Sequence, residues 1–291
     1  MSDLQKALQD FLNRIPPDEL RDEHDLELVS RQFMAMQNSQ PIDDFEGLSA
    51  SLMSESLSGI EGFDGFMLQR HQTFDDADLC RVPLVAMFHV LAENLGEKGI
   101  KLTPQGRLPR KVVRALYDAN RALVTDERFG RPPQLEEDSA AASAARVIYE
   151  ELKLVRLVKG RMVLTVRGKT LAQTAHVQKL FWMIFEFTAR NFNWGYTDGY
   201  DADPHIQNSF VFCLWLLKKN QGWQPFNQFL TRYYRAFPML SDDSMLALKL
   251  RMTRVWQWVG VLQVKFDENP RNYWGENDEL MLTRLGRALY G

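Results

Sequence analysis

The residues most able to do chemistry in this chain are Lys and Arg side chains gathered in two stretches of its middle. One stretch runs from Arg107 to Arg114, and the other runs from Lys159 to Lys169. Clustered cations of this kind neutralise phosphates along a nucleic-acid backbone and position a protein on it. The predicted nucleic-acid-binding residues are Arg107, Arg110, Lys111, Arg114, Lys159, Arg161, Arg167 and Lys169.

The helix expected from Ser139 to Leu152 argues against the reading of base sequence. Arg146 is its one basic residue, and it also carries Glu150 and Glu151. A helix of alanine and glutamate has few groups with which to read base edges. Two interpretations therefore stay open: nonspecific or indirect contact with DNA or RNA, or a basic surface that is solvated or faces protein.

The loop from Asn191 to His205 is the second candidate, because it combines carboxylates, a histidine and aromatic side chains. Hard or borderline metal ions bind such groups, and the loop offers Asp198, Asp201, Asp203 and His205. Their spacing does not fit a calcium loop, and the aromatic side chains can instead pin the loop between two helices. No catalytic residue, metal site or cofactor is predicted, since the chain lacks a phosphate loop, a dinucleotide glycine pattern and a nucleophile elbow.

A β-hairpin and two helices are predicted to position the basic residues. The hairpin lies within residues 151–171, because β-branched and apolar residues flank a turn at Lys159 and Gly160. Upstream, Ile100 to Leu102 forms a short strand, and Leu108 to Asn120 forms a helix with Pro109 in its first turn. Asp138 or Ser139 then caps an alanine-rich helix that runs to Lys153. This is the order of a winged-helix unit.

The sequence then repeats this order. Residues 163–171 (Val-Leu-Thr-Val-Arg-Gly-Lys-Thr-Leu) match residues 281–289 (Met-Leu-Thr-Arg-Leu-Gly-Arg-Ala-Leu) at Leu-Thr, Gly, a basic residue and Leu. A helix at 242–259 and a strand at 261–266 precede the second copy. On that helix, apolar spacing places Trp256 in the core, together with Met245, Leu246, Leu248, Met252, Val255 and Val259. Aromatic helices at 176–191, 206–220 and 225–237 separate the two copies.

The predicted fold class is mainly α with small β-hairpin wings. We expect an acidic helical region at residues 1–98 and a first winged-helix-like unit at 99–172. An aromatic helical linker and a second winged-helix-like unit follow at 173–291. Residues 1–100 contain 7 Lys and Arg against 19 Asp and Glu, whereas residues 101–171 contain 15 against 8. The acidic front either mimics a polyanion beside the basic middle, or the two segments simply attract each other or are solvated.

Four motifs resemble a family of uncharacterised bacterial proteins with winged-helix-like units, and the resemblance covers residues 42–291. They are Phe45-Glu-Gly-Leu-Ser, Ile100-Lys-Leu-Thr-Pro-Gln-Gly-Arg-Leu-Pro-Arg-Lys-Val-Val, Val163-Leu-Thr-Val-Arg-Gly and Asn191-Phe-Asn-Trp-Gly-Tyr-Thr-Asp-Gly-Tyr. The chain departs from the family pattern after the first motif, where Ala50-Ser-Leu replaces a Pro-Glu-Gln-like continuation. The resemblance implies no activity, and winged-helix domains as a class serve both DNA and protein contacts.

Composition favours a soluble cytoplasmic protein. Two cysteines, Cys80 and Cys213, are too few for a disulfide framework, and the N-terminus lacks a signal-peptide pattern. The most apolar stretches, 180–187 and 210–217, are about 8 residues long, whereas a membrane span needs about 20. The predicted function is non-enzymatic binding of DNA through basic winged-helix surfaces, without a membrane. The alternative is a protein-interaction scaffold or homodimer, and an enzyme at the 191–205 loop is less favoured.

Overall fold

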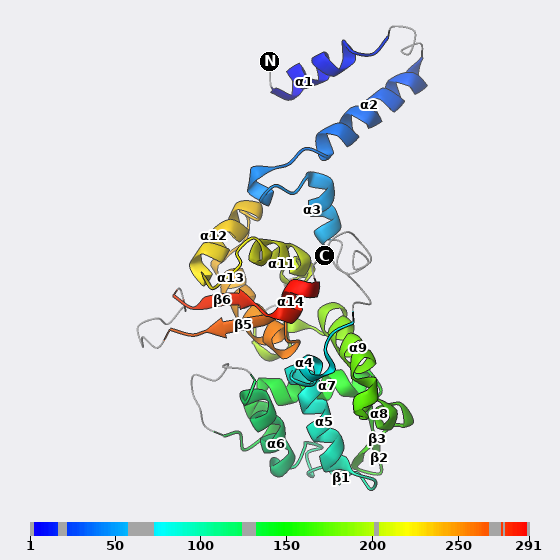
Figure 1. Cartoon of the computed structure of the whole chain (residues 1–291), viewed down its shortest axis with the longest axis vertical. Coiled ribbons are helices and arrows are strands. Elements are labelled where there is room, and N and C mark those ends of the chain that lie inside the picture. The colour runs from blue at the N-terminus through cyan, green and yellow to red at the C-terminus, as the bar shows by residue number, and fades with distance from the viewer. Residues whose placement is uncertain are drawn as a thin grey trace. The chain divides into compact units, whose positions relative to one another are not determined.

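A computed structural model describes residues 3–16, 22–57, 73–123, 132–200, 204–267, 275 and 277–289. The chain forms two compact units, Met1–Glu55 and Ser56–Gly291. Helices dominate the described residues, and two small three-stranded antiparallel sheets accompany them in the second unit (Figure 1). This confirms the prediction of a mainly α fold with small β wings.

The first unit is helical, as predicted. Its elements are α1 (Asp3–Leu12), α2 (Glu23–Asn38), the 3-10 helix η2 (Asp43–Phe45) and the start of α3 (Ala50–Leu57). The rings of Phe11 and Phe33 join α1 to α2, with centroids 5.3 Å apart. The sequence predicted the second helix from Pro17, but α2 begins at Glu23 because the Asp22 carboxylate caps it by accepting from the Asp25 N–H. Residues 17–21 lie outside the described part.

The second unit begins with α4 (Asp76–Cys80) and then contains a first module, which we define as residues 83–171. Its elements are α5 (Pro83–Leu95), β1 (Ile100–Lys101), α6 (Arg110–Arg121), the 3-10 helix η4 (Glu136–Asp138), α7 (Ala140–Glu151), β2 (Val155–Val158), β3 (Arg161–Leu164) and α8 (Val166–Leu171). The sheet order is β1-β3-β2. The Ser139 hydroxyl caps α7 by accepting from the Ala142 N–H, as predicted. Pro109 is the residue before α6 rather than part of its first turn.

The hairpin turn falls at Lys159 and Gly160, as predicted. Both residues have positive φ, 49° and 73°, as a two-residue turn that fits the strand twist requires. Gly99 lets β1 approach β3, because a β-carbon there would lie 2.3 Å from the Met162 carbonyl oxygen. The turn therefore joins β2 to β3, and Gly99 allows β1 to lie close to β3 on its other side.

A second module, residues 210–289, repeats this topology. It follows the 3-10 helix η5 (Thr174–His176), α9 (Val177–Arg190), the 3-10 helix η6 (Trp194–Thr197) and α10 (Pro204–Asn208). Its elements are α11 (Phe210–Lys218), β4 (Gln224–Pro225), α12 (Phe226–Ala236), α13 (Asp242–Arg251), the π-helical turn η7 (Met252–Trp256), β5 (Leu262–Lys265), β6 (Glu279–Leu282) and α14 (Arg284–Leu289). The sheet order, β4-β6-β5, matches that of the first module. Trp256 is fully buried, which confirms its placement in the core, and Trp258 is fully buried as well.

The matching motifs at 163–171 and 281–289 have the same atomic structure. Thr165 Oγ1 accepts from the Gly168 N–H at 2.9 Å and donates to the Lys153 carbonyl at 2.7 Å. Thr283 Oγ1 accepts from the Gly286 N–H at 2.9 Å and donates to the Gly260 carbonyl at 2.6 Å. In both modules this threonine ties the last helix to the residue that follows the third helix. None of the described helices is long and apolar enough to cross a membrane.

Candidate nucleic-acid interface

The eight predicted basic residues all lie in the first module, on three separate elements. Arg107, Arg110, Lys111 and Arg114 lie at or just before the start of α6, Lys159 and Arg161 lie at the hairpin turn, and Arg167 and Lys169 lie on α8. The α8 pair follows the end of β3 that is remote from the turn, about 10 Å along the strand. The sequence grouped these residues on one face, but the hairpin places the α8 pair at its base rather than at its tip.

Strand register reveals further cations that the sequence analysis did not select. Lys101 and Val158 both lie opposite Arg161, and Arg156 lies opposite Val163. Side chains opposite one another share a face, so Lys101, Arg156 and Arg161 lie on the outer face of the first sheet. The Leu102 N–H donates to the Gly160 carbonyl, which holds the end of β1 beside the hairpin turn. Alternation within the short strands was the signal that could have identified these residues.

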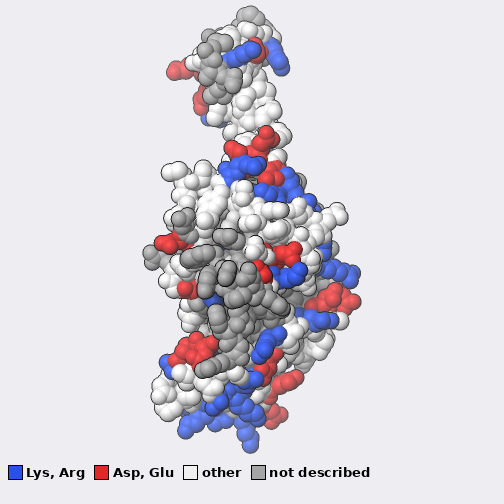
Figure 2. Space-filling model, turned by 90° about the vertical axis from the view of Figure 1, so that its left-hand side faces the viewer, with Lys and Arg blue, Asp and Glu red and all other residues white. Residues whose placement is uncertain are grey.

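Lys and Arg side chains gather at the end of the second unit that is drawn lowest in Figure 2. At the same height, Figure 1 places β1 and the lower end of α6. The elements that carry Lys101, Arg110, Lys111, Arg156 and Lys159 are drawn in the same part of Figure 1.

Several of these cations are already engaged within the protein. Arg107 pairs with Glu137 at 2.7 Å, and Arg114 pairs with Asp118 at 3.0 Å. Arg161 donates to the carbonyls of Lys98 and Gly99, and Arg167 donates to that of Leu152. Of the ten cations named so far, six are exposed and make no side-chain hydrogen bond or ion pair with a described residue: Lys101, Arg110, Lys111, Arg156, Lys159 and Lys169.

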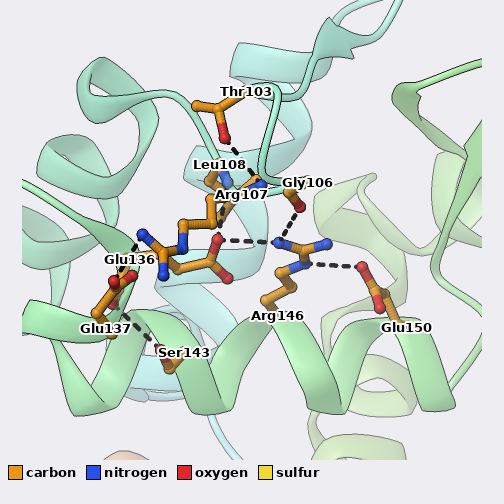
Figure 3. Close-up of polar contacts among 9 residues, drawn as sticks. All are labelled: Thr103, Gly106, Arg107, Leu108, Glu136, Glu137, Ser143, Arg146 and Glu150. Carbon is orange, nitrogen blue, oxygen red and sulfur yellow. Dashed lines mark hydrogen bonds and ion pairs between the residues drawn. The ribbon is translucent and has the colours of Figure 1, made fainter.

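A buried carboxylate positions the start of α6. Glu136 accepts from the Leu108 N–H at 2.7 Å and from Arg146 at 2.9 Å, so it joins the chain before α6 to α7 (Figure 3). Arg146 also donates to the Gly106 carbonyl and pairs with Glu150 at 2.8 Å. Burial alone would lower the pKa of Arg146, but the hydrogen bonds and charges of the two glutamates outweigh burial and raise it. The cluster therefore holds the start of α6 against α7, and the exposed residues Arg110 and Lys111 lie at that start.

The third helix of the module, α7, is enclosed by other elements. It contacts α5, α6, α9 and η6. Its buried side chains are Ala141, Ala142, Ala144, Ala145, Ile148 and Tyr149. Its one arginine, Arg146, is held by Glu136 and Glu150. This helix therefore has neither an open face nor a free cation with which to contact base edges in a major groove.

The loop from Asn191 to His205 joins elements of the fold in its described part. Asp198 pairs with Arg251 at 2.7 Å, and both side chains are 2% exposed. Trp194 donates its indole N–H to the Thr188 carbonyl and packs its ring edge against Trp256. Because η6 contacts both α7 and α13, the loop links the two modules. The described residues contain no group of three His, Cys, Asp or Glu that could hold a metal, and Asp201 and Asp203 lie outside them.

The second module has the same topology but a different surface. Its row of residues equivalent to Lys101, Arg161 and Val158 is Pro225, Glu279 and Lys265. Lys265 and Glu279 form an ion pair at 2.7 Å, so the row has no net charge. Pro109 and Pro225 precede the second helices of the two modules with nearly the same backbone angles, and the next residues are Arg110-Lys111 and Phe226-Asn227. The scaffold therefore does not require the cations of the first module.

Residues 81–177 match the family described as the Y4jL N-terminal domain. The matched segment is a third of the chain and coincides with the first module, which supports the resemblance to an uncharacterised protein family there. It includes the motifs at 100–113 and 163–168, whereas the motif at 191–200 lies beyond it. No curated protein and no solved structure matches the chain.

Proposed function

We propose that the chain is a non-enzymatic, cytoplasmic DNA-binding protein in which the two modules are winged-helix units. The first module contacts the phosphate backbone with the outer face of its sheet, its hairpin turn and the start of α6. One observation carries this proposal: five exposed cations of these elements, Lys101, Arg110, Lys111, Arg156 and Lys159, make no ion pair with a described residue, and the described residues of the second module form no matching cluster.

The backbone at the hairpin turn supports the assignment. Lys159 adopts φ 49°, a left-handed conformation that costs a residue with a β-carbon about 1 kcal/mol or more. Asn, Asp or Gly is the usual residue at this turn position. A lysine here places its charge at the tip of the wing, where a phosphate backbone can reach it.

The contact that we propose is independent of base sequence. The enclosed helix α7 cannot enter a major groove, and the unpaired cations lie on a sheet face and at a helix start. Phosphate contacts from such positions orient a protein on a duplex but carry no sequence information. The ligand class is therefore duplex DNA recognised through its backbone.

Fluorescence anisotropy with a labelled duplex, titrated at several salt concentrations, tests the proposal. The log of the affinity should fall with the log of salt by about 0.9 for each phosphate neutralised. The combined variant Lys101→Gln, Arg110→Gln, Lys111→Gln and Lys159→Gln should lose most of this slope. Arg284→Gln is the matched control, because Arg284 is an exposed cation on the second module. Absence of binding at low salt would reject the proposal and favour the protein scaffold.

A further inference from the structure

The strand β2 has an unpaired outer edge. In the sheet order β1-β3-β2, it pairs with β3 alone. Because Val158 and Arg161 close a two-residue turn, the N–H and C=O groups of Arg156 and Val158 point toward β3. Those of Val155 and Leu157 therefore point away from the sheet, and no backbone hydrogen bond to another described element uses them. Such an edge is a template for one more strand.

Apolar side chains of the hairpin and of the helix that follows it are exposed. Leu157 is 52% exposed and Val166, at the start of α8, is 85% exposed. The equivalent positions of the second module differ. Val264, equivalent to Leu157, is 5% exposed, and a charged residue, Arg284, is equivalent to Val166. The first module thus leaves uncovered an apolar position that its structural duplicate buries.

A groove of about 330 Å³ lies along the same edge, lined by Glu150, Lys153, Val155, Arg156, Leu157 and Thr165. Glu150 is paired with Arg146, whereas Lys153 and Arg156 make no ion pair with any described residue. Lys153 has φ 54°, and its equivalent in the second module is Gly260. Lys153 is exposed and keeps its charge beside the groove, in a strained backbone conformation for which the duplicate has glycine.

We propose that the outer edge of β2 is a docking site for an extended acidic segment of a partner protein. The segment adds to the first sheet as a further strand. Its backbone hydrogen-bonds to Val155 and Leu157, its carboxylates face Lys153 and Arg156, and an apolar side chain covers Leu157. Strand addition of this kind takes affinity from main-chain hydrogen bonds and specificity from alternate side chains. The inference does not depend on the proposed binding of DNA.

The probe is a fluorescein-labelled heptapeptide, acetyl-Thr-Val-Glu-Val-Glu-Val-Thr-amide, titrated with full-length protein by anisotropy. The same peptide with lysine in place of glutamate should bind at least about tenfold more weakly. N-methylation of alternate amides on one edge of the peptide should abolish binding, because it removes the donors to β2. Equal binding of the acidic and basic peptides, or of the N-methylated peptide, would overturn the proposal.

Variants of the protein locate the site. Leu157→Pro removes an outward N–H together with the apolar side chain and should weaken peptide binding by about fivefold or more. Leu157→Gln keeps the outward N–H, changes only the exposed apolar side chain and should also weaken binding. Lys111→Gln, remote from the edge in the sequence and on α6, should leave peptide binding unchanged.

Absence of duplex DNA binding with intact peptide binding would contradict the proposed function alone, and the reverse result would contradict this proposal alone. A concentration-dependent dimer that Leu157→Pro abolishes would show that a second copy occupies the edge and would overturn the proposal of a foreign partner.

Discussion

Lys153 and Gly260 occupy equivalent positions, each following the third helix of its module in a left-handed backbone conformation, with φ of 54° and 77°. Each also gives its carbonyl to the threonine that caps the last helix of the module, Thr165 or Thr283. The conformation is therefore a requirement of the scaffold, and only the second module meets it with the residue that adopts it without strain.

Lys153→Gly should raise the stability of the protein. The left-handed conformation costs lysine about 1–2 kcal/mol, and the extra freedom of glycine in the unfolded chain offsets about 0.5–1 kcal/mol of that gain. We expect a net increase of about 0.5–1 kcal/mol in the free energy of unfolding, measured by urea denaturation. Lys169→Gly, within α8, is the control and should destabilise by about 1 kcal/mol. A loss of stability in Lys153→Gly would show that the Lys153 side chain stabilises the fold.

Asp198→Ala should destabilise the protein strongly. The change removes the Asp198 carboxylate from the buried Arg251 guanidinium, and breaking a buried ion pair from one side costs about 3–5 kcal/mol. Asp118→Ala breaks the exposed pair with Arg114 and should cost less than about 1 kcal/mol. Thermal denaturation compares the two variants. A small effect of Asp198→Ala, together with stabilisation of the wild type by an added divalent metal, would reopen the metal interpretation of the loop.

Much of the fold could be predicted from sequence because its signals are local. The Lys159-Gly160 turn, the Ser139 cap and the repeated Leu-Thr and Gly positions each follow from the conformational needs of a few neighbouring residues. The start of α2 at Glu23 was missed, since the cap at Asp22 competes with several other acidic residues nearby. The cations of the sheet face were missed because the register that aligns Lys101 with Arg161 joins segments about 60 residues apart. The pairing of Asp198 with Arg251 depends on tertiary packing in the same way.

Gly168→Ala and Gly286→Ala should both destabilise the protein, for the same reason in each module. A β-carbon at Gly168 would lie 2.0 Å from the Leu154 carbonyl oxygen, and one at Gly286 would lie 2.3 Å from that of Val261. Because the clashing atoms belong to the backbone, the helix must move, at a cost of about 1–3 kcal/mol or more. Gly222→Ala is the control, since open space surrounds its β-carbon position. Equal stability of all three variants in urea denaturation would show that α8 and α14 can shift freely.

The proposed DNA contact makes a sharper prediction for Lys111 and Lys169, two exposed lysines of the same module without a partner among the described residues. Lys111 lies at the start of α6 with the other unpaired cations, whereas Lys169 lies on α8 at the base of the hairpin. Lys111→Gln should lower the slope of log affinity against log salt by about 0.9, the loss of one phosphate contact. Lys169→Gln should leave the slope unchanged, and both variants should bind duplexes of unrelated sequence equally.

An equal loss of slope in both variants would show that net charge, rather than a defined face, governs binding. A preference for one duplex sequence would contradict recognition through the backbone, because the enclosed helix α7 offers no free group with which to read base edges.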